Sequence, residues 1–213
     1  MRKYALLLIC AVVCIVACHK NTVPHKLLSP VLKGLFGYKV GSYWVYKDSV
    51  NNEIDSFYVY YSSAYTEHNG TDDVDRMDMS LRKGTTNPND SEKWFFTLID
   101  SAFSIGFESG KDSVEWMLTG VTLFTYPFKL GNLFNSNGDS GAVTNGYPTF
   151  FSNGMQFGNT ICSYHKNIPY LESETYKDYF YVSVDAGITK VIFNHPQDSV
   201  YRVLELERYK IVK

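Results

Sequence analysis

The sequence predicts one all-β domain, an antiparallel sandwich or half-barrel of about ten to twelve short strands, with a short helix at its N-terminal end. Three observations predict this fold class. The composition favours strands and turns, with 17 Tyr, 14 Phe and 15 Gly among 213 residues. Short apolar or alternating segments recur at regular spacing between turn residues. In the body of the chain, apolar residues recur at helical spacing in only one stretch, which is about two turns long.

The first 17 residues have the layout of an export signal. A cationic Met1-Arg2-Lys3 precedes an uninterrupted apolar run over residues 5–16, and Ala17 stands before Cys18. The run is too short to cross a bilayer, which takes about 20 apolar residues. This ending resembles a bacterial lipoprotein signal, which is cut before a lipidated cysteine. We therefore expect residues 1–17 to be removed and Cys18 to carry the lipid anchor, palmitate included. The alternative is an ordinary secretory signal that is cut further on.

Removal of the signal changes the charge and the cysteine content. Loss of Arg2 and Lys3 leaves 18 basic residues against 22 acidic ones, a net charge of −4. This mildly acidic balance argues against a nucleic-acid partner, whose binding proteins carry a basic stripe. With Cys18 acylated, Cys162 is the one free thiol left, so we expect no intramolecular disulfide. Several acyl chains together hold a protein on a membrane durably.

We expect residues 18–28 to comprise the lipidated cysteine and a tether, and residues 29–213 to form a single domain. Ser29 has the place of a helix N-cap, Pro30 that of the first helical residue, and Gly37 follows the end. So short a helix must dock its apolar stripe on the body. A membrane-surface helix is the weaker alternative, because the only basic residues of this segment are Lys26 and Lys33.

The strands are predicted from alternation and from the turns between them. Residues 75–81 show the cleanest alternation, which places Met77, Met79 and Leu81 on one buried face. Polar residues predict loops at 68–73 and 135–141. The other expected strands cover residues 38–50, 54–61, 93–100, 102–108, 113–119, 121–126, 148–151, 158–164, 176–184, 188–193 and 200–212.

A short pattern occurs twice, 90 residues apart. Residues 39–44 and 129–134 share Lys, an aliphatic residue, Gly and an aromatic residue three positions after the Gly. The repeat predicts two related sheets or half-barrels. In each, the glycine would open a strand where the backbone bends, and the aromatic side chain would cover the core.

The same segments carry a family resemblance. Gly-x-x-Trp-x-Tyr at residues 41–46, Pro-Phe-Lys-Leu-Gly at 127–131, Phe-Gly-Asn-Thr-Ile at 157–161 and the ending at 179–190 are similar to those of uncharacterised Bacteroidota lipoproteins with a periplasmic β-barrel domain of unknown function. The resemblance implies a β-barrel fold and a cell-envelope location. It implies no catalytic residues. In the final turn, Val184-Asp185-Ala186 stands where many such chains have a small apolar residue and glycine.

The sequence favours neither an enzyme nor a metal site. Gly138-Asp139-Ser140-Gly141 is similar to a protease nucleophile motif, but His68 is the only upstream histidine in the body and lacks the flanking residues. Asn135, Asn137 and Asp139 lack the later ligands of a calcium loop. We expect Asp72, Asp73 and Asp75 to be solvated rather than to bind calcium, and Cys162 to be a buried thiol. We therefore expect no catalytic residue, no metal ligand and no cofactor.

Four Asp-Ser-aliphatic segments resemble the sequon for O-linked glycosylation of exported Bacteroidota proteins. Turn chemistry followed by the start of a strand is the alternative explanation of this pattern. The candidate modified residues are Ser49, Ser101, Ser113 and Ser199.

The aromatic residues support the remaining hypotheses. A platform that stacks sugar rings would use Tyr58, Tyr60, Tyr61, Trp94 and Trp116, although burial in the core is the competing explanation. We expect a non-enzymatic binding or assembly module of the cell envelope whose ligand the sequence does not specify, with an envelope protein or a glycan as its partner. One alternative is a carbohydrate-binding lipoprotein, and another is a carrier of a small apolar ligand inside the barrel. Residues 19–22 lack an acidic cluster typical of surface export, which favours the periplasmic face of the outer membrane.

Overall fold

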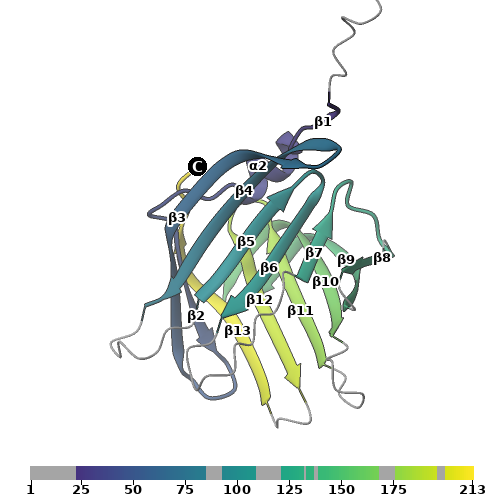
Figure 1. Ribbon diagram of the computed structural model, residues 1–213. Coiled ribbons are helices and arrows are strands. Elements are labelled where there is room, and N and C mark those ends of the chain that lie inside the picture. The colour runs from purple at the N-terminus through teal and green to yellow at the C-terminus, as the bar shows by residue number, and fades with distance from the viewer. Residues whose placement is uncertain are drawn as a thin grey trace, which may run out of the picture.

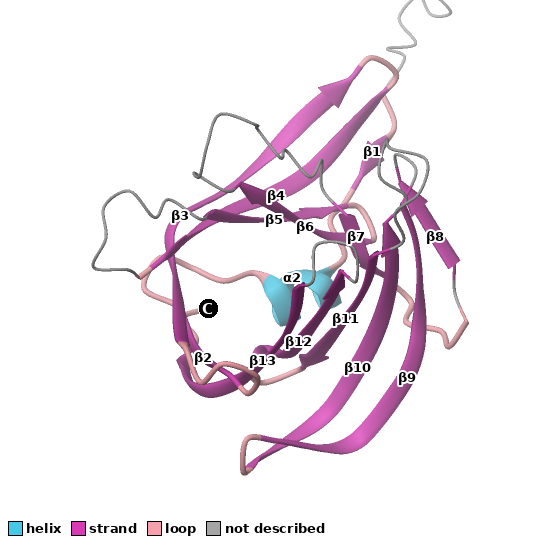
Figure 2. Cartoon of the chain, turned by 90° about the horizontal axis from the view of Figure 1, so that it is seen from below, coloured by secondary structure: helices cyan, strands magenta, loops and turns pink. Residues whose placement is uncertain are grey.

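The computed structural model describes residues 23–84, 93–108, 121–131, 133–136, 139–167, 176–195 and 200–213. Within them, antiparallel strands form one nearly closed, barrel-like sheet with one short helix at its end (Figures 1 and 2). The predicted fold class is therefore confirmed. Several predictions fall outside the described residues, namely the lipidated Cys18, the strand at 113–119, and the candidates Ser113, Trp116 and Ser199.

Strands that follow one another in the chain lie side by side in the sheet. The order is β7-β6-β5-β4-β3-β2-β13-β12-β11-β10-β9-β8, and the short β1 pairs with β4. The elements are β1 (His25–Lys26), α2 (Pro30–Phe36), β2 (Tyr43–Asp48), β3 (Ile54–Asn69), β4 (Asp72–Lys83), β5 (Lys93–Ile99), β6 (Ala102–Glu108), β7 (Val121–Thr125), β8 (Leu133–Ser136), β9 (Asp139–Ser152), β10 (Met155–Asn167), β11 (Tyr176–Ser183), β12 (Gly187–His195) and β13 (Val200–Lys210). Apart from β1, this is an up-and-down meander.

The meander has two halves, β2–β7 and β8–β13, which are joined where β2 pairs with β13. Each half begins with the repeated pattern. Gly41 and Gly131 have φ angles of 95° and 73°, which favour glycine. The Gly41 N–H donates to the Val59 carbonyl of β3, and the Gly131 N–H donates to the Val143 carbonyl of β9. The repeat therefore corresponds to the same backbone turn before β2 and before β8.

Helix α2 closes one end of the barrel and forms as its sequence predicts. It is capped by Ser29, whose Oγ accepts from the Leu32 N–H at 3.4 Å, and Gly37 ends it. Leu32 and Phe36 are buried, and the Phe36 ring stacks on Phe103 of β6 at 4.3 Å. The helix thus docks its apolar stripe into the barrel. In the described residues, no helix has the length and apolarity needed to cross a membrane.

Two predicted polar loops are wrong. β3 continues to Asn69 and β4 begins at Asp72, so the loop predicted at 68–73 is a tight turn. The loop predicted at 135–141 contains the paired ends of β8 and β9, with Ser136 opposite Asp139. Both segments are polar because they are hairpin ends, where strand pairing satisfies the backbone and the side chains remain free to be hydrophilic.

The hairpin of β9 and β10 is long and its tip reaches β13. Ser152 Oγ donates to Glu205 Oε1 at 3.0 Å, and Asn153 Nδ2 donates to the Leu206 carbonyl at 3.4 Å. Figure 2 shows this hairpin extending past β11, β12 and β13. Cys162 of β10 is buried, as predicted, and burial raises the pKa of its thiol. A thiol in that state is a poor nucleophile.

Candidate functional site

A surface of tyrosines covers the outside of β2, β3 and β4. We call it the tyrosine face, and it comprises Tyr43, Tyr58, Tyr60, Tyr61 and Tyr65 with Arg76, Asp78 and Arg82. Its register is set by pairing, since Tyr43 lies opposite Tyr58, and Tyr58 lies opposite Arg82. Between these residues the strands place Trp44, Phe57 and Leu81 in the core. The alternation of strand side chains therefore positions the face.

A β-bulge places three of the predicted aromatics together. Val59 pairs with Leu81 and Tyr61 pairs with Ser80, so Tyr60 is the extra residue of β3. The guanidinium carbon of Arg82 lies 4.3 Å from the centre of the Tyr60 ring, a cation–π contact. Tyr58 and Tyr61 are exposed on either side of Tyr60. The structure thus brings the predicted Tyr58, Tyr60 and Tyr61 together on the outside.

The upper part of the tyrosine face is polar. Tyr65 Oη donates to Asp78 Oδ2 at 2.6 Å, and this bond raises the pKa of Tyr65. Arg76 Nε donates to Asp78 at 2.9 Å, and Thr97 Oγ1 donates to Asp78 Oδ1 at 2.9 Å. The aromatic rings of this face can stack on a ring of a ligand, and the hydroxyl, carboxylate and guanidinium groups beside them can hydrogen-bond the substituents of that ring.

Trp94 does not belong to this face, and the prediction that it stacks a ligand is wrong. Its side chain is 1% exposed inside the barrel, where its ring stacks on Phe57 at 4.0 Å. It follows the parity of Phe96 and Leu98, which are also buried. Conversely, Tyr43, Tyr65 and Arg82 belong to the face but were not predicted from the sequence. Strand alternation could have placed Tyr43 and Arg82 on the outer face, because they adjoin the buried Trp44 and Leu81. The bulge at Tyr60 has no sequence signature.

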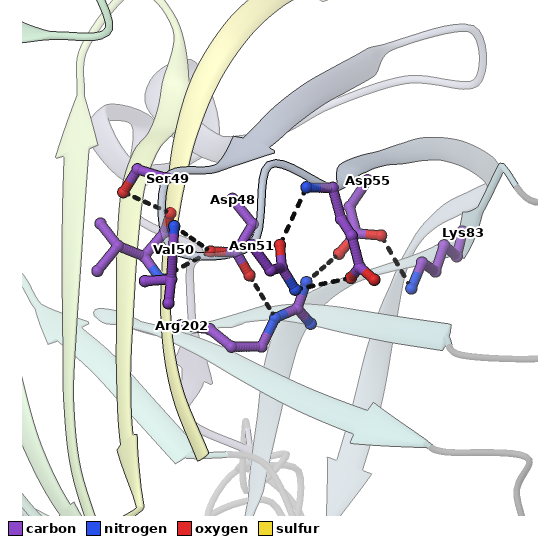
Figure 3. A network of polar contacts seen from close by, with 9 residues as sticks. Asp48, Ser49, Val50, Asn51, Asp55, Lys83 and Arg202 are labelled. Carbon is purple, nitrogen blue, oxygen red and sulfur yellow. Dashed lines mark hydrogen bonds and ion pairs between the residues drawn. The ribbon is translucent and has the colours of Figure 1, made fainter.

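A charged network that was not predicted from the sequence lies at the opposite end of the barrel from α2. Arg202 of β13 donates from Nε to Asp48 Oδ2 at 2.8 Å and from Nη2 to Asp55 Oδ2 at 2.7 Å (Figure 3). Lys83 Nζ lies 2.9 Å from Asp55 Oδ1. Asp48 Oδ1 also accepts from the Val50 N–H at 3.0 Å. The network joins β2, β3, β4 and β13.

The surroundings of Asp48 favour the ionised form of its carboxyl. Burial alone would raise the pKa of Asp48, but hydrogen bonds from Arg202 and from the Val50 N–H outweigh it and lower that pKa. Asp48 therefore stays ionised at neutral pH and cannot donate a proton. Two carboxylates matched by one guanidinium and one ammonium form a neutral set, which suits a structural tie.

A second buried polar group lies on the other side of the barrel, where β10 approaches β7. The Nε2 atom of His165 in β10 lies 3.1 Å from Ser163 Oγ, and both residues are buried. Burial lowers the pKa of His165 to about 4, against the opposing effect of a hydrogen bond with the Leu123 backbone of β7. Its imidazole is neutral at pH 7. His165 therefore links β10 to β7, the strand at one end of the sheet.

The acidic residues predicted to be solvated are paired with cations or histidines. Lys26 lies 2.6 Å from Asp72, His68 lies 2.8 Å from Asp73, and His25 lies 2.9 Å from Asp75. Among the described residues, no group of three or more His, Cys, Asp and Glu side chains is arranged to hold a metal ion.

Two candidate glycosylation serines are described. Ser49 is exposed in the turn after β2, and its Oγ donates to the Val203 carbonyl at 3.4 Å. Ser101 is half-buried in the turn between β5 and β6, beside Asp100 at φ 50°. Both lie in turns, as the turn-based explanation of the pattern requires. Their modification stays a prediction.

Two solved structures align with this chain. One is a protein of Bacteroides fragilis described as exported and with a YmcC-like fold, at 12% identity and a TM-score of 0.46, covering 81% of this chain and 97% of that one. The other, described as a lipoprotein of Parabacteroides distasonis, has 12% identity and a TM-score of 0.40, covering 81% and 96%. No family model and no curated protein matches the sequence.

Proposed function

We propose that this protein is a lipid-anchored, non-enzymatic module of the cell envelope that binds a glycan on its tyrosine face. The export signal directly before Cys18 supports the envelope location and the lipid anchor. We place the protein on the periplasmic side of the outer membrane. The lipid on Cys18 is the membrane partner.

The observation that carries the glycan proposal is the grouping of Tyr58, Tyr60 and Tyr61 on the outside of β3, with Arg82 of β4 over one ring. Aromatic rings pack on the apolar faces of sugars, and the hydroxyls of Tyr58, Tyr60 and Tyr61, which have no partner among the described residues, can hydrogen-bond sugar hydroxyls. Asp78 and Arg76 supply further acceptors and donors at the edge of the face. A charged side chain over a ring also holds that ring in place.

The interior packing favours this proposal over the carrier alternative. Beside β2–β6 the interior is filled by aromatic side chains in contact, with Trp94 stacked on Phe57 and Phe103 packed edge-on to Phe96 at 5.4 Å. A carrier needs an apolar hollow. The part of the interior beside these strands is occupied by the protein's own rings.

Affinity electrophoresis tests the proposal with the mature protein and polysaccharide extracted from the envelope of the producing bacterium. We expect the polysaccharide to retard the wild type and Tyr58→Ala/Tyr61→Ala to weaken binding about tenfold or more, at about 1 kcal/mol for each ring. The matched control is Tyr201→Ala, which removes an exposed tyrosine of β13 outside the face and should leave binding unchanged. Equal retardation of all three proteins, or of none, would refute the glycan proposal.

A further inference from the structure

The barrel end that carries α2 exposes apolar side chains. We call it the capped end, and it is formed by α2, the segment before it and the turn that leads into β2. Leu27 is 66% exposed and Val31 is 42% exposed, although both adjoin residues buried in the core. Val23 and Val40 are exposed as well, and Lys33 and Lys39 are exposed among them. Apolar side chains interspersed with lysines suit a membrane interface.

The chain that leads to Cys18 enters the body at this same end. β1 pairs in parallel with β4, with His25 opposite Asp73 and Lys26 opposite Val74. The Pro24 carbonyl accepts from the Asp73 N–H at 2.9 Å. Ion pairs of His25 with Asp75 and of Lys26 with Asp72 reinforce the pairing. Figure 1 shows β1 beside α2 at the top of the barrel.

The reach of the tether limits where the anchor can lie. Cys18 precedes Pro24 by six residues, which span at most about 22 Å when fully extended. β13 alone has 11 residues, about 35 Å at roughly 3.3 Å per residue. A membrane anchor at Cys18 therefore lies near the capped end and far from the end that holds Arg202.

We propose that the capped end rests on the bilayer surface that carries the anchor, with Leu27, Val31 and Val40 entering the interface and the Arg202 network facing away. The inference rests on the proposed anchor at Cys18. It adds an orientation, because the pairing of β1 with β4 fixes the anchored chain to one end of the barrel. The tyrosine face then stands beside the membrane on the wall of the barrel.

The test couples the mature chain to vesicles through Cys18 in vitro, so it does not depend on lipidation in the cell. The vesicles contain phosphatidylethanolamine, phosphatidylglycerol, a maleimide lipid and a lipid with an acceptor dye on its headgroup. Cys162 is buried with a raised thiol pKa, and Cys18→Ser checks that coupling is specific. A fluorescent amino acid replaces Gly34, where an added Cβ meets nothing within 4 Å, or Val50, exposed at the far end.

We expect energy transfer to the acceptor to be several-fold stronger from position 34 than from position 50. Leu27→Glu/Val31→Glu should reduce the transfer from position 34, while the matched control Val50→Glu/Ile54→Glu, which changes two apolar residues exposed at the far end, should not. Unchanged thermal unfolding verifies that each variant folds. Equal transfer from both positions, stronger transfer from position 50, or no effect of the capped-end charges would overturn the orientation and leave the anchor itself to be judged by lipid labelling in cells.

Discussion

The indole Nε1 of Trp44 donates a hydrogen bond to the carbonyl oxygen of Ala186 at 2.8 Å, across 142 residues of sequence. Tyr46, two residues along β2, donates from Oη to the Ile188 carbonyl at 2.8 Å. Both bonds are buried, and they fasten β2 to the turn before β12 and to the start of β12. The two segments are among the four on which the resemblance to Bacteroidota lipoproteins rests. Their residues therefore serve the closure of the barrel rather than a surface site.

Gly187 is the position where this contact tolerates least change. Its φ is 75°, and an added Cβ would collide with Tyr38 Oη and lie 3.3 Å from Trp44 Nε1. We expect Gly187→Ala to lower the free energy of unfolding by about 3 kcal/mol, from left-handed backbone strain and overpacking. Urea unfolding measures it. Adding Tyr38→Phe should relieve the collision but leave the backbone strain. If the losses of unfolding free energy in the two single variants simply added up in the double variant, the predicted contact would be contradicted.

Tyr38 and Tyr46 form a matched pair for testing the buried hydroxyls. Among the described residues, Tyr38 Oη has no hydrogen-bond partner, whereas Tyr46 Oη has the Ile188 carbonyl. Tyr46→Phe should therefore cost about 1–2 kcal/mol of stability, and Tyr38→Phe should cost nothing or stabilise the protein. Thermal and urea unfolding of the two variants provide the comparison. The reverse ranking would refute the hydrogen-bond assignment.

The charged network predicts a pH-dependent effect of Arg202→Met. In the wild type the lowered pKa of Asp48 stabilises the fold above the usual carboxyl pKa, and this stability is lost as the pH falls through the folded-state pKa. Without the guanidinium, burial raises that pKa. We expect a deficit of about 3 kcal/mol at pH 7 that shrinks toward pH 4, because the unpaired carboxyl becomes protonated.

The control for the network is Lys190→Met, which removes a partly exposed pair with Glu205 and should cost less than about 1 kcal/mol. Urea unfolding of both variants at pH 7 and pH 4 makes the comparison. A deficit for Arg202→Met that stays constant or grows on acidification would show that the guanidinium does not stabilise the ionised form of Asp48.

His165 predicts a second pH dependence with a different window. Its folded-state pKa is about 4, below the unfolded value of 6.5, so the folded state binds fewer protons between these limits. The stability due to the neutral imidazole is complete above pH 6.5 and is lost as the pH falls to 4, by about 3 kcal/mol. His165→Gln should lack this loss. If the free energy of unfolding of the wild type and of His165→Gln varied with pH in the same way, the imidazole would not be buried.

Much of the fold follows from local sequence chemistry. Ser29, Pro30 and Gly37 specify the bounds of α2 because capping depends on neighbouring residues. The alternation of Met77, Met79 and Leu81 specifies the buried face of β4 for the same reason. The repeated pattern before β2 and β8 indicates the two halves. These features need no knowledge of distant contacts.

The site depends on contacts that the sequence does not reveal. Arg202 meets Asp48 from 154 residues away, and only the pairing of β13 with β2 brings them together. Trp94 lies inside the barrel because it pairs with the buried Leu81 and alternates in step with Phe96. The bulge at Tyr60 and the extension of β3 to Asn69 arise from pairing with β4. Polar composition alone therefore suggested loops where hairpins form.

Metabolic labelling with a palmitate analogue, in cells that produce either the full-length protein or its Cys18→Ala variant, tests the lipid anchor directly. We predict that the wild type is labelled, loses residues 1–17 and fractionates with the outer membrane, and that the variant loses both the label and the membrane association. A wild type that is unlabelled and freely released, or a variant that fractionates as the wild type does, would contradict the lipid anchor.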